Sequence, residues 1–77
     1  TFALARAYVD QLERSNGLAS GRISAVRKAL ATAESGSASQ RQSTLTAVAS
    51  QLDADANGSS DAAKVRTLAA TVRKLAM

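Results

Sequence analysis

The chain has 77 residues, with no cysteine, histidine or proline, and its ten basic and six acidic residues give a net charge of +4. Without cysteine it forms no disulfide and offers no thiolate to a metal. Without histidine it lacks the commonest general base and metal ligand. Thiol- and imidazole-based catalysis is therefore excluded, and we expect no enzymatic activity.

The length supports one domain, residues 1–77, of modest stability, because so short a chain buries only about 60% of its unfolded surface. Alanine, the strongest helix former, is the most frequent residue. No apolar run of about 18 residues predicts a membrane span, and no signal-peptide pattern is visible. Because the chain starts at Thr1 and is rich in small residues with little lysine, we expect a fragment or appended module of a larger bacterial protein.

The first predicted helix covers residues 2–15. Steps of three and four place its apolar side chains on one face. That stripe consists of Phe2, Ala5, Tyr8 (or Val9) and Leu12. Asn16-Gly17 ends the helix, and we expect Gly17 to adopt the left-handed cap conformation with Leu18 folding back on Leu12.

The second predicted helix covers residues 20–34, with Ser20 as its N-cap. Its stripe is formed by Ile23, Val26, Leu30 and Ala33. The small, turn-favouring residues 35–39 then predict a loop.

The third predicted helix follows that loop and is capped by Ser37 or Ser39. Its polar front end, residues 40–43, is expected to fray. Its stripe consists of Leu45, Val48 and Leu52. The helix ends at Asn57-Gly58, a strong turn signal.

The fourth predicted helix is capped by Ser59 or Ser60, with Asp61 in its first turn, where negative charge suits the helix dipole. Its stripe is formed by Val65, Leu68, Val72 and Leu75. The cations Arg73 and Lys74 lie near its end. Four amphipathic helices with short loops predict an all-α fold, a small antiparallel bundle of four short helices. The alternative is a three-helix bundle with the first helix or the start of the third loosely attached.

The polar segment 53–61 matches the opening of an EF-hand calcium loop, which has oxygen ligands at positions one, three, five and nine and a glycine at position six. The candidate metal ligands are Asp53, Asp55, Asn57 and Asp61, with Gly58 at the sixth position. Two departures weaken the match, because Lys64 stands where a bidentate glutamate belongs and Ser60 where an apolar residue belongs. An ordinary turn is our first interpretation, without a cofactor, and calcium is the alternative.

Two further features of this segment matter. Asp53 and Asp55 lie in the last turn of the third predicted helix, where negative charge is unfavourable. If no metal offsets them, we expect Arg66 or Lys64 to do so. The triplet that starts at Asn57 also fits the N-glycosylation sequon, although a turn already accounts for it.

The basic residues are Arg6, Arg14, Arg22, Arg27, Lys28, Arg41, Lys64, Arg66, Arg73 and Lys74. A nucleic-acid interface gathers such residues on one face, whereas these are spread over every segment. We therefore expect a solvated surface and keep nucleic-acid binding as a second alternative. Locally, the spacing of four predicts helix-supporting pairs of Asp10 with Arg6 and Arg14.

The stretches VDQLERSNGL, LATAESG and AVASQLDA, followed by a closing helix, resemble the FIMAH domain, a short helical module, over residues 8–76. The matching residues are Val9, Leu12, Gly17, Leu18, Leu30, Ala33, Leu45, Val48, Leu52, Leu68 and Ala69. The resemblance implies an extracellular or cell-surface, non-catalytic module attached to a larger bacterial or archaeal protein. We therefore expect an accessory module of a secreted bacterial protein whose partner is a neighbouring domain of the parent chain or a second copy.

Overall fold

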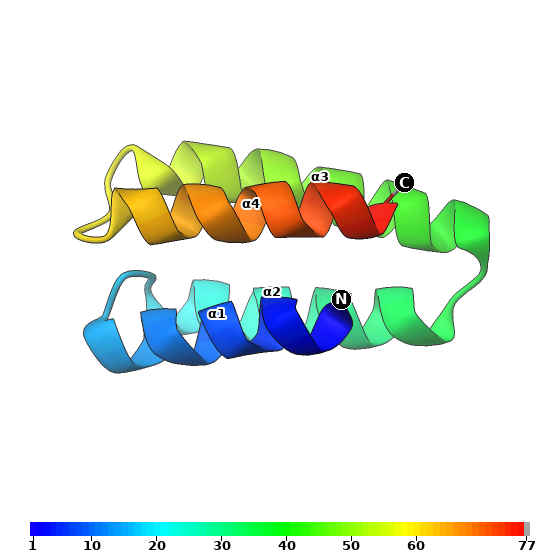
Figure 1. The fold of residues 1–77 in the computed structure, drawn as a ribbon, viewed down its shortest axis with the longest axis horizontal. Coiled ribbons are helices and arrows are strands. Elements are labelled where there is room, and N and C mark those ends of the chain that lie inside the picture. Colours follow the sequence, from blue (N-terminus) through cyan, green and yellow to red (C-terminus); the bar gives the residue numbers. More distant parts are fainter. Residues whose placement is uncertain (77) are drawn as a thin grey trace.

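The computed structural model describes residues 1–76 and contains four helices in that range: α1 (Phe2–Ser15), α2 (Ser20–Ser35), α3 (Ala38–Ala56) and α4 (Ala62–Ala76). Successive helices run in opposite directions, with α1 and α2 in one layer and α3 and α4 in the other (Figure 1). Each helix packs against two neighbours, so that α1 closes the ring against α4. The predicted all-α antiparallel bundle is confirmed, and the three-helix alternative is wrong.

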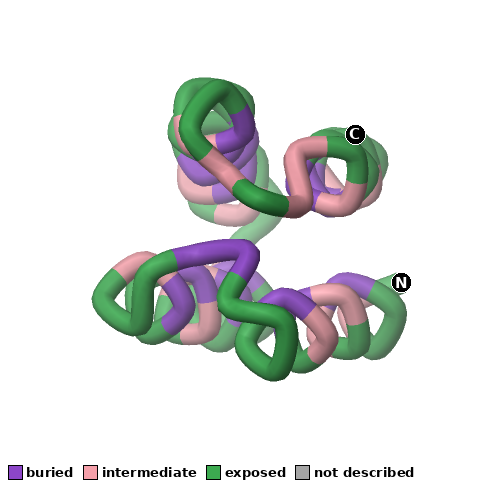
Figure 2. Tube along the Cα trace, turned by 90° about the vertical axis from the view of Figure 1, so that its left-hand side faces the viewer, coloured by how far each residue is buried: buried purple, intermediate pink, exposed green. Residues whose placement is uncertain are grey.

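The buried residues of the four helices lie toward one interior (Figure 2), where their apolar side chains form one cluster. The largest fully buried side chains are Leu12, Ile23, Leu30, Leu45, Leu52, Leu68, Val9, Val26, Val65 and Val72. Leu52 and Leu68, from different helices, are both fully buried. Within residues 1–76 no polar or charged side chain is buried, so the interior of the bundle is entirely apolar.

The α3–α4 pair is built around alanine. Ala49, Ala56 and Ala69 are each no more than 1% exposed, and they stand among the leucines and valines of the two helices. Because alanine adds little volume, the backbones of α3 and α4 approach closely and the larger neighbours interdigitate. No helix within residues 1–76 has both the length and the apolar character that crossing a bilayer requires.

The helix starts differ from expectation in two places. The first residue of α2 is Ser20 itself, and the N-cap position is Ala19, which makes no side-chain cap. The prediction that the front end of α3 frays is also wrong, because Ser37 and Gln40 form a capping box. The side chain of each residue accepts a hydrogen bond from the main-chain N–H of the other. This reciprocal pair satisfies two main-chain donors at the start of the helix, those of Ser37 and Gln40, and holds the polar front end helical.

Candidate functional site

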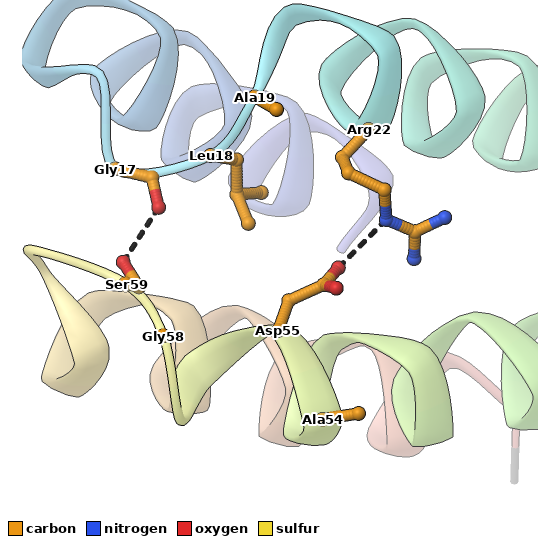
Figure 3. A pocket seen from close by; sticks show the side chains of 8 residues that line it. All are labelled: Gly17, Leu18, Ala19, Arg22, Ala54, Asp55, Gly58 and Ser59. Carbon is orange, nitrogen blue, oxygen red and sulfur yellow. Dashed lines mark hydrogen bonds and ion pairs between the residues drawn. The ribbon is translucent and has the colours of Figure 1, made fainter.

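The two loops at one end of the bundle lie side by side and bring together the residues that the sequence singles out (Figure 3). The Ser59 hydroxyl donates to the main-chain oxygen of Gly17 across 2.5 Å. It also accepts from the main-chain N–H of Asp61 at 2.9 Å. One hydroxyl thus ties the α3–α4 loop to the α1–α2 loop and shapes the approach to α4. Since α4 begins at Ala62, Asp61 precedes the helix and does not lie in its first turn.

The end of α1 has the expected kind of cap with a different residue in the left-handed conformation. Asn16 has φ 57° and ψ 31°, and no glycine in the described chain has positive φ. The N–H of Asn16 donates to Glu13 O and that of Gly17 to Leu12 O, the Schellman pattern. Asparagine tolerates this conformation better than most residues, so Gly17 is not needed for it.

Gly17 serves instead to make room. A Cβ built on it would lie 2.6 Å from Leu12 Cδ2 and 3.2 Å from Asp61 Cβ. Only a residue without a side chain lets the α1–α2 turn lie this close to both its own helix and the opposite loop. The prediction that Gly17 is left-handed is wrong, and close approach is the reason for a glycine here.

A shallow surface cavity of about 350 Å³ opens between the two loops. Its lining residues are Gly17, Leu18, Ala19, Arg22, Ala54, Asp55, Gly58 and Ser59. Across it, Arg22 Nε donates to Asp55 Oδ2 at 2.8 Å, and both side chains are about one-quarter to one-third exposed (Figure 3). The two charges of this ion pair balance each other, and Arg22 also donates to Gln51 Oε1 at 3.2 Å, so the recess carries no net charge.

The four candidate calcium ligands do not form one cluster. Asp53 and Asp55 lie within α3 and Asn57 is its C-cap, so the helix runs through the first positions of the loop pattern. Residues two apart on a helix point to nearly opposite faces. Accordingly, Asp53 pairs with Arg73 of α4, whereas Asp55 pairs with Arg22 of α2. No group of three or more metal-binding side chains occurs in residues 1–76.

The cations that offset these two carboxylates are therefore not the expected ones. Arg66 contributes only through a longer-range attraction to Asp53. Lys64 instead donates to Gln11 Oε1 of α1 at 2.7 Å. The hydrogen bond from Arg73 is the main cause that lowers the pKa of Asp53.

The remaining ion pairs join α2 to α1. Arg27 contacts Asp10 at 2.8 Å and Glu13 at 2.9 Å, and Arg6 contacts Glu34 at 2.5 Å. These hydrogen bonds lower the pKa of Glu13 and of Glu34. The predicted pairing of Asp10 with neighbours on its own helix is absent from the ion pairs of the described chain.

Two cations have roles that the sequence did not indicate. The guanidinium of Arg41 lies 5.7 Å from the centre of the Phe2 ring, and that of Arg6 lies 5.9 Å from it. Arg41 Nε also donates to Ala33 O at 3.3 Å. The aromatic ring is thus held by a cation from its own helix and one from α3, which ties the start of α1 to the α2–α3 end.

The cations outside these contacts are Arg14, Lys28, Arg66 and Lys74, which lie on three different helices. A second shallow cavity, of about 310 Å³, is lined at the α2–α3 end by Thr32, Ser39, Gln40, Ser43 and Thr44. It holds no charged group. No protein-family model, characterised protein or solved structure matches the chain, so functional inference rests on its own side chains.

Proposed function

We propose that this bundle is a non-catalytic accessory module of a larger, secreted bacterial protein and that it acts by binding protein. The partner is a neighbouring domain of the parent chain or a second copy of the bundle. The observation that carries the proposal is the closed apolar interior: every buried side chain in residues 1–76 is apolar. Polar chemistry is thereby confined to the surface.

The surface carboxylates support the same proposal. In a chain without histidine or cysteine, acid–base catalysis falls to Asp, Glu, Lys or the single Tyr. Five carboxylates are engaged by arginine: Asp10, Glu13, Glu34, Asp53 and Asp55. Hydrogen bonds from arginine lower the pKa of Glu13, Glu34 and Asp53, and a general acid working near neutral pH needs the opposite shift.

The exposed apolar surface suggests where a protein partner binds. Leu4 is 45% exposed, the only exposed large apolar residue within 1–76. Tyr8, four residues later and therefore on the same face of α1, is half-buried at the edge of the core. By helical spacing the two side chains lie on the same side of α1 as Gln11, which accepts from Lys64 of α4, and they form an apolar edge there. The FIMAH resemblance, which implies a non-catalytic extracellular module, supports this proposal, and the spread of the free cations favours protein over nucleic acid.

Two measurements test the proposal. Sedimentation equilibrium across a wide concentration range should show either self-association or a monomer. Self-association should be lost in Leu4→Glu and retained in Ala47→Glu, which places the same charge on an exposed site of α3. If the chain is a monomer, hydrogen exchange in α1 should slow within the full-length parent relative to the isolated bundle. A monomer whose α1 exchanges at the same rate in both contexts contradicts the proposal.

A further inference from the structure

The chain contains two Asn-Gly dipeptides, and the fold places both at the same end of the bundle. Asn16-Gly17 lies in the α1–α2 loop and Asn57-Gly58 in the α3–α4 loop. In such a dipeptide the main-chain nitrogen of glycine attacks the side-chain carbonyl carbon of asparagine, because no side chain on the glycine hinders the approach. The reaction requires that nitrogen to be released from its hydrogen bond and turned toward the asparagine side chain.

The first dipeptide is held in place. Gly17 is buried, and its N–H donates to Leu12 O at 2.9 Å while its carbonyl accepts from Ser59 at 2.5 Å. The space around it is filled, since an added Cβ would lie 2.6 Å from Leu12 Cδ2. Turning the Gly17 nitrogen toward Asn16 breaks its hydrogen bond to Leu12 O and moves a turn that Leu12 and Ser59 hold in place. Asn16 therefore reacts only after the bundle opens at this end.

The second dipeptide, Asn57-Gly58, is exposed to solvent and loosely packed. Asn57 and Gly58 are both exposed, and a Cβ built on Gly58 meets no described atom within 4 Å. The Gly58 N–H makes a single, longer main-chain bond, 3.2 Å to Asp55 O, in the final turn of α3. Opening a terminal turn costs far less than opening a packed core. The Gly58 nitrogen is thus released by local fraying alone.

We propose that Asn57 is a self-modification site of the folded protein. Gly58 N forms a bond to Asn57 Cγ, the bond from Cγ to the side-chain nitrogen breaks, and that nitrogen leaves as ammonia with the proton lost from Gly58 N. The product is a succinimide ring. Water then opens the ring: cleavage between Gly58 N and Cγ gives aspartate, and cleavage at the main-chain carbonyl gives isoaspartate. No oxidant or second substrate takes part.

The product changes the charge and the path of the α3–α4 loop. A carboxylate at position 57 lowers the net charge by one unit and lies between Asp55 and Asp61 in the sequence. Isoaspartate also lengthens the main chain by a methylene group within residue 57, two positions before Ser59, whose hydroxyl joins the two loops. The modification therefore alters the contact between the two halves of the bundle.

The test follows both asparagines in one sample. The purified full chain is incubated at mildly alkaline pH, in buffer and in urea that unfolds it, and is then digested with trypsin. Cleavage after arginine and lysine gives residues 15–22 and 42–64, each with one asparagine. Mass spectrometry measures conversion at each site. In buffer, Asn57 should convert roughly tenfold faster than Asn16 or more, because terminal and core openings differ by more than 1.4 kcal/mol. In urea the two rates should be similar.

The matched variant is Asn57→Gln, because glutamine forms the corresponding six-membered ring far more slowly. Conversion in peptide 42–64 should then fall to background while Asn16 keeps its rate. Equal rates at the two sites in the folded protein overturn the proposal, as does faster conversion at Asn16. So does an Asn57 that stays intact in buffer over a period in which it converts in urea.

Discussion

Replacing Gly17 by alanine should insert a methyl group where the α1–α2 turn has no room for one. The new Cβ would lie 2.6 Å from Leu12 Cδ2 and 3.2 Å from Asp61 Cβ. Leu12 is fully buried, so its methyl group has no open space to move into. The turn must therefore shift away from α1, which strains the hydrogen bond from Ser59 to the Gly17 carbonyl.

The expected loss follows from what overpacking costs. Forcing an extra carbon into a filled site typically destabilises a protein by about 1–3 kcal/mol. A chain of this length has a total stability of roughly 4–12 kcal/mol. The melting temperature should fall by about 4–8 °C for each kcal/mol lost. Urea unfolding followed by circular dichroism should show a lower midpoint with an unchanged slope.

The control is Gly21→Ala. Gly21 lies in the first turn of α2, and a Cβ there meets no described atom within 4 Å. Because alanine favours the helix, this variant should gain up to about 0.5–1 kcal/mol. Opposite signs for the two glycines are therefore expected. A Gly17→Ala protein as stable as the parent refutes the argument from close approach.

Three further perturbations have definite outcomes. Leu68→Ala should destabilise the fully buried α3–α4 contact by about 2–5 kcal/mol in urea titrations; a loss below about 1 kcal/mol counts against a shared core. Acidification should lower stability, because arginine hydrogen bonds lower the pKa of Glu13, Glu34 and Asp53 from ordinary values of 4.5 and 3.8. Their contribution is complete above the ordinary values and is lost as pH falls toward the folded-state values; stability that rises on acidification contradicts this. Millimolar calcium should leave the melting temperature unchanged, and Asp55→Ala should lower it equally with and without the metal, because Asp55 binds Arg22. A calcium-dependent rise that disappears in this variant would establish the metal site.

The helices and the core follow from the sequence because burial and periodicity are local signals. Steps of three and four place Val9, Leu30, Leu52 and Leu68 on the inner faces of their helices, and all four are fully buried. The periodicity alone does not decide whether Tyr8 or Val9 faces the core. Packing decides it in favour of Val9, and Tyr8 remains at the edge of the core.

The surface pairs could not be predicted, because they depend on how the helices dock. Arg22 and Asp55 are 33 residues apart in sequence and meet only when α2 lies against α3. Spacing along one helix favoured Asp10 with Arg6 or Arg14, yet the structure pairs Asp10 with Arg27. An ion pair between α1 and α2 thus forms in place of the pairs expected within α1.

The first half of the calcium-like pattern lies on the end of α3, as the predicted end of that helix at Asn57-Gly58 implies. Residues 53–56 alternate aspartate with alanine, and alanine gives the backbone no cause to leave the helix. The helix therefore continues to Ala56, and the two aspartates point to different neighbours. Only the turn at residues 57–61, with glycine and serine, has the freedom that a loop requires.

The contact between Ser59 and Gly17 has a kinetic consequence. It joins residues 42 positions apart, whereas each helical hairpin folds through nearby contacts. Contacts of large sequence separation carry a high chain-entropy cost and tend to form late in folding. Removing this hydroxyl should therefore speed the unfolding of the bundle and leave the rate of refolding almost unchanged.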